Sequence, residues 1–552
     1  MKNNEKKGVK LVFCRTLSSQ SGASVTMGSI ASFLRQNGYN VKLCFLLRSG
    51  FDNALKILEE AEKYSIIIAK PNFKDVSKLL PLLKRAKNDG SVKRIFLCGP
   101  YASLNAQEIM KSERWLDGII VGNPEETALD LLNSLSDDCS KWNFDCPGGI
   151  WRILEINEIR VAAPRKLIKS LNELPFPARD IEELEDSNYV NLESSRGCYY
   201  SCSFCHVPLS HDLNIGDKRM VRDPILVVDE IEQIHERLGK TLFIFNDPIF
   251  WSSHKDDERI LKLCNEIKKR KLNIKLYIYL RCNPFPSEEI IKSLAKAGLV
   301  RVFLGVENAS AQSLMRYNKL LNLNQVETAW DILRKCGVNI HIGYIVFEPY
   351  STIRDIRENV QYLYALGKLF RLGVIIESPR VIPHSGLYFK LVKDSLLDKN
   401  LNFYDLTYGF KFKEDAVANL FYALREIFLQ ALKKRWYQLE YYCVSGELLR
   451  NLAKKERPNL SEEIDKLSGQ FLALVKEAND LINSFLLSCI ELTEQGRGGG
   501  EIQKNSLTLA FIKNFESLHY DLDIEWAKLV NNIINLCGEK PYEELYKGVE
   551  EL

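Results

Sequence analysis

The first 135 residues alternate short apolar runs with stretches of helical spacing. Five runs are almost entirely apolar: Lys10–Cys14, Val41–Leu47, Ile66–Ala69, Ile95–Cys98 and Gly118–Val121. Strands of a parallel sheet are buried on both faces and are therefore apolar throughout. Between the first two runs, apolar residues recur three or four positions apart from Met27 to Leu34, which predicts an amphipathic helix. This alternation predicts a doubly wound, Rossmann-like sheet over residues 1–135.

Small and polar residues follow three of these runs, at Lys70–Asn72, Gly99–Ser103 and Gly122–Thr127. Doubly wound sheets bind ligands outside the carboxyl ends of their strands. Small residues at such positions let backbone amides approach a bulky ligand. Ordinary turns also need glycine and proline, so this pattern alone leaves the choice between a ligand site and plain turns open.

Residues 136–180 contain Asp, Ser, Pro and Gly in the mixture typical of a linker. Residues 181–395 return to alternating strand-like and helix-like segments. Six apolar runs there end in polar residues: Val190–Leu192, Leu242–Phe245, Leu276–Leu280, Val302–Val306, Ile340–Phe347 and Gly373–Ile376. Six βα units are fewer than the eight of a closed barrel, so we expect a partial (β/α)6 barrel with its chemistry at the strand ends.

The remaining residues, 396–552, are expected to form a helical domain. Apolar residues keep a helical period from Leu420 to Leu432. Two interpretations stay open for this domain: a bundle that caps the barrel, or a lid over its open side that sets substrate choice. The chain is thus predicted to belong to the α/β class, with a doubly wound sheet, a partial barrel and a helical domain in that order.

Composition excludes several classes of protein. Of the 552 residues, 46% are hydrophobic and 27% charged, as in ordinary globular proteins. The net charge of +3 is too small to indicate a nucleic-acid partner or an acidic membrane surface. No apolar run reaches the roughly 18 residues of a membrane span, and the N-terminal residues do not form a signal peptide. Eleven of the 14 cysteines are scattered singly, so a reducing cytoplasm is expected.

The other three cysteines, Cys198, Cys202 and Cys205, have the spacing C-x3-C-x2-C. Thiolates favour iron–sulfur clusters, zinc or copper(I). A four-iron cluster normally takes four cysteines, so three would leave one iron open to a small molecule. The alternative is a zinc knuckle completed by His206, but zinc sites of that kind usually pair two half-sites and the sequence has no second Cys/His cluster.

With Phe204 directly before the third cysteine, this loop resembles that of the radical S-adenosylmethionine (SAM) superfamily. Two later segments, Gly305–Ser310 and Pro383–Tyr388, resemble the fourth and sixth units of that family's barrel. The resemblance implies a [4Fe-4S] cluster held by the three cysteines, with SAM chelated to the open iron. It also implies an external electron donor of the flavodoxin or ferredoxin type, whose electron splits SAM into a 5′-deoxyadenosyl radical.

The same resemblance implies a set of SAM contacts. Phe204 would pack near the adenine, whereas Asp247, Arg281 and Glu307 would face the amino-acid part or the ribose. Arg281 can hold a carboxylate through two parallel hydrogen bonds. An Arg281–Glu307 pair at neighbouring strand ends is equally expected as a structural salt bridge.

Residues 96–135 resemble the cobalamin-binding domain that precedes the barrel in B12-dependent radical SAM enzymes. The turns Gly99-Pro100-Tyr101 and Gly122-Asn123-Pro124-Glu125 depart from the family's usual sequences at these places. The implied cobalamin contacts are Ser18, Gln20, Ser21, Gly22, Asn72, Gly99, Pro100, Tyr101, Gly122 and Glu125. No histidine precedes His206, so a histidine ligand to cobalt from this domain is not expected, as is usual for radical SAM methylases.

These resemblances imply a C-methyltransferase that acts on an unactivated carbon of a natural-product or peptide substrate and uses two SAM molecules per turnover. One rival is a cobalamin enzyme that catalyses rearrangement, ring contraction or cyclisation. In another, the N-terminal domain is only a docking module. Methylthiotransferases, in which Cys14, Cys44 and Cys98 would hold a second cluster, are a weaker match because Cys44 and Cys98 lie within apolar strands.

Overall fold

A computed structural model describes residues 8–14, 25–46, 66–71, 76–90, 92–136, 139, 141–153, 156–180, 189–402 and 407–537. The chain forms two compact units. The first comprises Met1–Ile249, Arg380–Lys390 and Asp398–Gly409; the second comprises Phe250–Pro379, Leu391–Leu397 and Phe410–Leu552. The boundary after Ile249 falls inside the segment expected to form the barrel, and the domain limits expected at 135, 180 and 395 stay predictions.

The first unit contains the expected doubly wound sheet, with strand order β2-β1-β3-β4-β5-β6-β7. The strands are β1 (Gly8–Cys14), β2 (Asn40–Leu46), β3 (Ile66–Lys70), β4 (Arg94–Leu97), β5 (Gly118–Ile120), β6 (Gly149–Ile153) and β7 (Glu158–Val161). The first five pair in parallel, and β6 and β7 pair antiparallel to their neighbours. The Rossmann-like architecture predicted from the apolar runs is confirmed.

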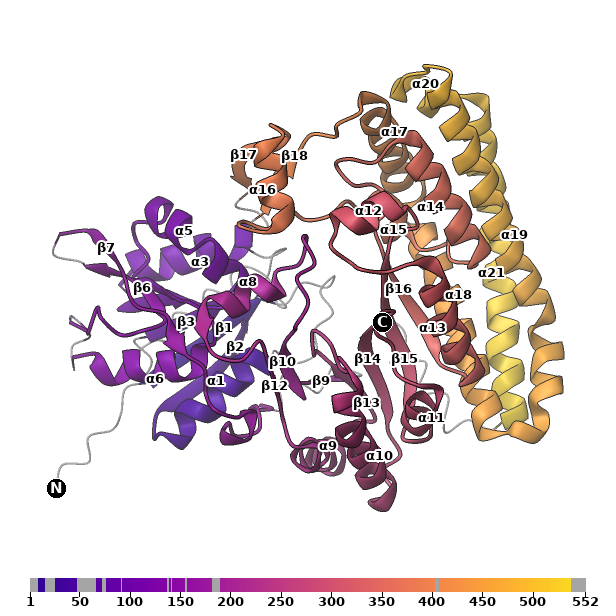
Figure 1. The fold of residues 1–552 in the computed structure, drawn as a ribbon. Coiled ribbons are helices and arrows are strands. Elements are labelled where there is room, and N and C mark those ends of the chain that lie inside the picture. The colour runs from indigo at the N-terminus through magenta and orange to yellow at the C-terminus, as the bar shows by residue number, and fades with distance from the viewer. Residues whose placement is uncertain are drawn as a thin grey trace. The chain divides into compact units, whose positions relative to one another are not determined.

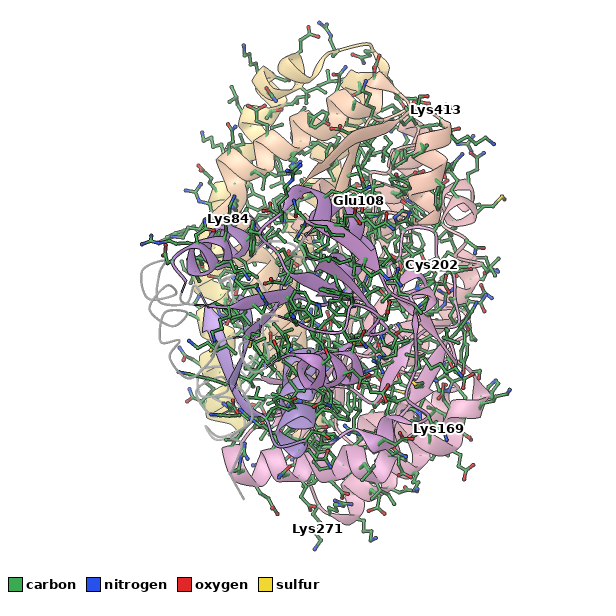
Figure 2. The ribbon with its side chains drawn as sticks, turned by 90° about the vertical axis from the view of Figure 1, so that its left-hand side faces the viewer. Lys84, Glu108, Lys169, Cys202, Lys271 and Lys413 are labelled. Carbon is green, nitrogen blue, oxygen red and sulfur yellow. The ribbon has the colours of Figure 1, made fainter. Side chains whose placement is uncertain are left out.

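Helices cover both faces of this sheet (Figure 1). The helices α1 (Val25–Gln36) and α6 (Pro124–Ser134) contribute to one apolar core, whereas α3 (Val76–Asn88) and α5 (Ala106–Ser112) contribute to the other. Successive strand residues point to opposite faces, so Ile67 belongs to the second core and Ile68 to the first. The polar side of α3 faces solvent, as the exposed Lys84 shows (Figure 2).

The linker expected at residues 136–180 includes β6 and β7, so the linker interpretation is wrong for these strands. Trp151 of β6 is fully buried and donates from Nε1 to the Cys146 carbonyl at 2.9 Å. Its ring packs edge-on against Phe96 of β4, with the centroids 6.0 Å apart. The neighbouring β7 is an exposed edge strand. The Asp, Ser, Pro and Gly residues that suggested a linker lie mostly outside these two strands.

Five of the six strands expected for the barrel are present. In the first unit, β9 (Tyr189–Leu192) and β13 (Leu242–Phe245) pair in parallel. In the second unit, β14 (Lys275–Arg281), β15 (Leu299–Glu307) and β16 (Asn339–Tyr344) also pair in parallel. The intervening helices include α9 (Pro224–Leu238), α10 (Asp257–Lys269), α11 (Glu288–Lys296) and α13 (Leu323–Lys335).

The sixth expected strand, Gly373–Ile376, is instead part of the helix α15 (Leu372–Ile376). A short apolar run does not distinguish a buried strand from a buried helix by its periodicity. The tertiary surroundings decide between them here: the Leu372 amide donates to the Glu440 carboxylate at 3.3 Å, and the Trp436 indole donates to the Phe370 carbonyl at 2.7 Å.

The C-terminal region is helical, as predicted. Its main helices are α17 (Asp415–Glu426), α18 (Lys433–Glu456), α19 (Ser461–Glu494) and α21 (Ser506–Cys537). The long helices α19 and α21 lie side by side (Figure 1), with Phe485 and Phe511 stacked 3.9 Å apart between them. No helix in the part of the chain that the structure describes is both long and apolar enough to cross a membrane.

Replacing Trp436 by alanine should lower the free energy of unfolding by about 3–5 kcal/mol, the range for a large-to-small change in a core. The indole is fully buried, stacks on Phe515 at 5.1 Å and donates the hydrogen bond to Phe370. The neighbouring Tyr437→Ala is the matched control because Tyr437 is 53% exposed. Chemical denaturation should separate the two variants; equal losses would contradict this account of the helical core.

Candidate functional site

The cysteine loop lies in the first unit between two short elements. It follows β10 (Ser195–Gly197), which pairs antiparallel with β12 (Arg219–Val221), and precedes α8 (Val207–Asp212). All three cysteine side chains are partly exposed; Cys202 is labelled in Figure 2. The Cys205 amide donates to the Cys202 carbonyl at 3.0 Å, which closes a tight turn between the last two cysteines.

The segment Pro383–Tyr388, which resembles the sixth unit of the family's barrel, packs against this loop. The Leu387 amide donates to the Ser203 carbonyl at 2.8 Å. A Cβ placed on Gly386 would lie 3.0 Å from the Cβ of Ser203, so this approach favours glycine. Phe204 is half-buried within the loop, and its expected contact with adenine stays a prediction.

The three thiols are the donor set that the sequence predicts for a cluster. Among the residues with described positions, no three His, Cys, Asp or Glu side chains form a group that could hold a metal ion. In a four-iron cluster each thiolate binds its own iron, so three thiols on one loop would leave one iron open. The assignment of Cys198, Cys202 and Cys205 to a cluster stays a prediction.

His206 has a separate environment. Its ring lies 5.9 Å from the ring of Tyr101, the first residue after Pro100 in the turn that follows β4. Burial and the nearby Arg380 lower the pKa of His206 to about 4, so the imidazole is neutral at physiological pH. The structure thereby joins the residue after the last cysteine to one of the expected cobalamin-binding turns.

Asp247 anchors the start of the cysteine loop. It follows β13 and is buried, and it accepts hydrogen bonds from the Ser194 amide at 2.7 Å, the Ser194 hydroxyl at 2.5 Å and the Ser195 hydroxyl at 2.8 Å. Both carboxylate oxygens are thus used within the protein. Its expected contact with SAM stays a prediction; the geometry assigns Asp247 the task of holding the loop.

The other two expected SAM contacts lie in the second unit, at the carboxyl ends of β14 and β15. Arg281 donates to the carbonyls of Lys319 at 2.9 Å and Asn283 at 3.1 Å. Glu307 accepts from Lys319 Nζ at 2.6 Å, so its ion-pair partner is Lys319 and not Arg281. A Cβ on Gly305 would lie 2.8 Å from the Glu307 carboxylate, so the buried pair favours glycine there. The SAM-binding roles of Arg281 and Glu307 stay predictions.

Several of the expected cobalamin contacts form one wall of a cavity of about 180 Å³ in the first unit. Its lining includes the turns after β4 and β5 and the start of the cysteine loop: Gly99, Pro100, Gly122, Glu193, Arg196, Gly197 and His206. The structure therefore brings together two motifs that are about 100 residues apart in the chain. Ser18, Gln20, Ser21, Gly22 and Asn72 lie outside the described residues.

Both glycine turns pack against a side chain of the same unit. Gly99 and Gly122 have φ values of +95° and +79°, a region that favours glycine. Gly99 is buried, and a Cβ added to it would lie 3.0 Å from the Lys70 side chain. Gly122 is partly exposed, and the amide nitrogen of Asn214 would be 2.3 Å from an added Cβ. A ligand contact at either glycine would therefore require the Lys70 or the Asn214 side chain to move.

Glu125 does not point toward an open ligand site. It is 2% exposed and accepts two hydrogen bonds from Arg196, from Nη2 at 2.8 Å and Nη1 at 3.2 Å. The Ser29 hydroxyl donates to the same carboxylate at 2.6 Å, and Arg196 Nε donates to Glu193 at 2.7 Å. The sequence analysis missed this network, and the cobalamin contact expected for Glu125 stays a prediction. In the sequence, this network was indicated by one feature: Glu193 precedes Arg196 by three residues. Acidic and basic residues at this spacing are common on protein surfaces.

Burial and opposite charges shift the pKa values of the network in different directions. Burial by itself raises the pKa of Glu125, but Arg196 and Ser29 together hold it below its usual range. Burial raises the pKa of Glu193, which Arg196 opposes. Burial lowers the pKa of Arg196, but the two carboxylates outweigh that effect and raise it. Opposite charges within hydrogen-bond distance favour the ionised form of each partner.

Two of the three cysteines that would hold the second cluster of a methylthiotransferase lie in apolar surroundings. Cys44 and Cys98 are buried in the two cores of the sheet. Burial raises the pKa of Cys98 to about 12, although Lys70 partly opposes this, so its thiol stays protonated at neutral pH. A protonated thiol is a poor metal ligand. The side chain of Cys14 lies outside the described residues.

Comparison with known proteins gives one family match and several distant relatives. Residues 192–363 match the family model of the radical SAM superfamily. The chain is 24% identical over 344 residues to the anaerobic magnesium-protoporphyrin IX monomethyl ester cyclase of Rubrivivax gelatinosus, covering 60% of each chain. It is 23% identical to the hopanoid C-3 methylase of Methylococcus capsulatus, over 57% of this chain and 59% of the relative. The chain thus spans about 60% of the length of these curated relatives.

The whole chain also resembles a solved structure. The cobalamin-dependent SAM radical enzyme OxsB, determined with aqua-cobalamin and SAM bound, superposes with a TM-score of 0.70. The superposition covers 99% of this chain and 83% of OxsB at 19% sequence identity. At this level of identity, the likeness establishes a shared fold.

Replacing Lys319 by methionine should destabilise the second unit by about 3 kcal/mol, because it leaves the Glu307 carboxylate buried without its partner. The side chains of Lys319 and Glu307 are only 5% and 11% exposed. The double variant K319M/E307Q should recover most of this loss in chemical denaturation. Lys292→Met is the control, since its pair with Glu288 lies on the surface and should contribute nothing measurable. A double variant as unstable as K319M would refute the pairing.

Proposed function

Because the chain carries a radical SAM domain within the fold of the cobalamin-dependent radical SAM enzymes, we propose that it is such an enzyme and methylates an unactivated carbon of a small-molecule or peptide substrate. One observation carries the proposal. The cysteine loop and the glycine turns after β4 and β5 line the same cavity within one compact unit. A methyl carrier and a radical source must work on one substrate, so their binding elements have to be neighbours.

Each group in the site then has a task. Cys198, Cys202 and Cys205 hold the cluster, and Asp247 fixes the loop that carries them. The turns after β4 and β5 would hold the corrinoid once the Lys70 and Asn214 side chains are displaced, and buried side chains around it would exclude water. When bound, the cluster, SAM and cobalamin supply the radical and the methyl group, while the protein supplies binding and orientation. An external electron donor of the flavodoxin or ferredoxin type reduces the cluster.

A reducing, cytoplasmic setting is part of the proposal. Cys198, Cys202 and Cys205 are partly exposed, and thiolates on an exposed loop need protection from oxidation. The alternative reaction is a non-methylating one, such as cyclisation, because one of the relatives is named a cyclase and another a methylase. Product analysis separates these two reactions.

The protein purified and reconstituted without oxygen should contain about four irons per chain with one iron distinct from the others. Replacing Cys198, Cys202 and Cys205 together by alanine should remove both the iron and SAM cleavage. Cys336→Ala is the matched control, since Cys336 is also partly exposed but is not part of the loop that carries Cys198, Cys202 and Cys205. Iron and sulfide analysis with Mössbauer spectroscopy makes the measurement. Wild-type protein that binds zinc and no iron would end the proposal.

Methyl transfer predicts two nucleoside by-products in about equal amounts, because one SAM donates methyl and another forms the radical. S-Adenosylhomocysteine should accumulate together with 5′-deoxyadenosine and methylated product. A deuterium placed on the carbon to be methylated should appear in 5′-deoxyadenosine. The assay is a time course with candidate substrate, SAM, reductant and cobalamin, followed by mass spectrometry.

A different outcome would identify the alternative reaction. Steady formation of 5′-deoxyadenosine without S-adenosylhomocysteine, with a product of unchanged carbon count, would overturn methylation. It would leave a radical SAM enzyme of rearrangement or cyclisation. Failure of the protein to bind any corrinoid would instead indicate that the N-terminal sheet is a docking module.

A further inference from the structure

The second unit contains a cavity of about 720 Å³ that shares no residue with the site described above. Its lining comes from the end of α13, the start of β16, the end of α14 (Ile353–Ala365) with the residues after it, and the helices α18 and α19. The carboxyl ends of β14 and β15, which carry Arg281 and Glu307, are not part of this lining. Volumes of about 300–1,000 Å³ are typical of cavities that bind small molecules.

The two long helices each turn one face toward the cavity. On α18, the lining residues Cys443, Glu447 and Arg450 are four and three positions apart; on α19, Leu472 and Val475 are three apart. Residues at these spacings lie on one side of a helix. Cys443 is buried, whereas the other four side chains are partly exposed. These four are therefore accessible to a ligand.

Both acidic side chains of the lining already have partners. Glu447 accepts a hydrogen bond from Lys368 Nζ at 2.9 Å. Asp480 accepts from Lys476 Nζ at 2.7 Å and from the Tyr364 hydroxyl at 2.9 Å. A cationic ligand would have to break one of these pairs. The lining therefore does not favour a cation.

Donors, by contrast, remain available in the lining. Arg334 is exposed and forms no ion pair with any residue that the structure describes. Arg450 donates from Nη2 to Asp465 at 2.7 Å, but its buried Nε has no hydrogen-bond partner among the described residues. The lining has four basic and two acidic side chains, so basic groups stay in excess even when Asp465 is counted. A concave site with this excess attracts anions.

Apolar side chains form much of the remaining wall. Leu366, Leu472 and Val475 are partly exposed, and the buried rings of Trp330 and Phe471 lie among them in the lining. A small inorganic anion would leave these side chains in contact with water. A ligand with an apolar body would remove that surface from water, which is favourable.

We propose that this cavity binds an amphiphilic organic anion, with its carboxylate or phosphate on Arg334 and Arg450 and its apolar body against Leu472 and Val475. Such a ligand contacts α13 and the end of α14 as well as α18 and α19, so it stabilises the packing of the C-terminal helices on those that follow the barrel strands. No lining residue belongs to the cysteine loop. The site therefore goes beyond the proposed function and does not depend on it.

The test is isothermal titration calorimetry of the full-length protein with four probes. Decanoate and decyl phosphate carry the two kinds of anionic head on the same apolar chain, and the tighter of the two identifies the preferred head. Decylamine has the same chain with the opposite charge, and acetate has the head without the chain. Both should bind at least about 10-fold more weakly, the loss expected for one charge-assisted hydrogen bond or for most of the apolar contact. Decanoate should also raise the midpoint of thermal unfolding as its concentration rises.

Three variants locate the site. Arg334→Met should raise the dissociation constant of decanoate about 10-fold, since it removes a charged donor from an exposed position where folding does not need it. Arg334→Glu should abolish the preference for decanoate over decylamine. Val475→Glu places a carboxylate on the apolar wall and should weaken decanoate at least as much as Arg334→Met. Lys335→Met is the matched control, because this exposed neighbour is not in the lining and its loss should leave binding unchanged.

Several results would overturn the proposal. One is a wild-type protein that binds neither decanoate nor decyl phosphate at millimolar concentration; another is equal affinity for decanoate and decylamine. Equal weakening by Arg334→Met and Lys335→Met, or unchanged binding in both Arg334→Met and Val475→Glu, would refute the location. Protein without its cluster should bind decanoate as well as reconstituted protein does, and a loss of binding there would contradict a site confined to the second unit.

Discussion

The cysteine loop depends on buried carboxylates that come from other parts of the chain. Asp247, at the end of β13, receives three hydrogen bonds from Ser194 and Ser195. Glu125, at the start of α6, holds Arg196 through a bidentate ion pair within the same unit. The residues between Cys198 and Cys205 form neither helix nor strand. Without these two anchors the loop would lose its position, because turns and bends alone do not fix the direction of a segment.

The same constraint applies to three buried acidic residues, at the ends of β13 and β15 and at the start of α6. A carboxylate at the end of a buried strand is costly unless donors satisfy it. Asp247 is satisfied by backbone and hydroxyl groups, Glu307 by Lys319, and Glu125 by Arg196 and Ser29. Each satisfied carboxylate fixes a neighbouring segment. In this way the strand ends become rigid supports on which ligands can be held.

Structural support and ligand binding compete for the same side chains. The family resemblance suggested ligand contacts for Asp247, Glu307 and Glu125, and in the structure each of the three has protein partners. Gly122 likewise meets Asn214 of its own chain. Gly99 is buried beside the Lys70 side chain. By contrast, Cys198, Cys202 and Cys205 are all partly exposed. Burial therefore separates the supporting residues from the accessible ones.

The sequence by itself determined the features that depend on local patterns. Apolar runs and helical spacing predicted the doubly wound sheet, five of the barrel strands and the C-terminal helices, because burial imposes these periods directly. The spacing of Cys198, Cys202 and Cys205 indicated a cluster, since the ligands lie on one short loop.

The tertiary structure alone decided the rest. It made Gly373–Ile376 helical and added β6 and β7 to the sheet, because burial against distant residues such as Trp436 and Phe96 selects among conformations that short runs leave open. It also paired Glu125 with Arg196 across 71 residues. A charge has no period and can pair at any sequence distance, so its partner is determined only when the chain is folded.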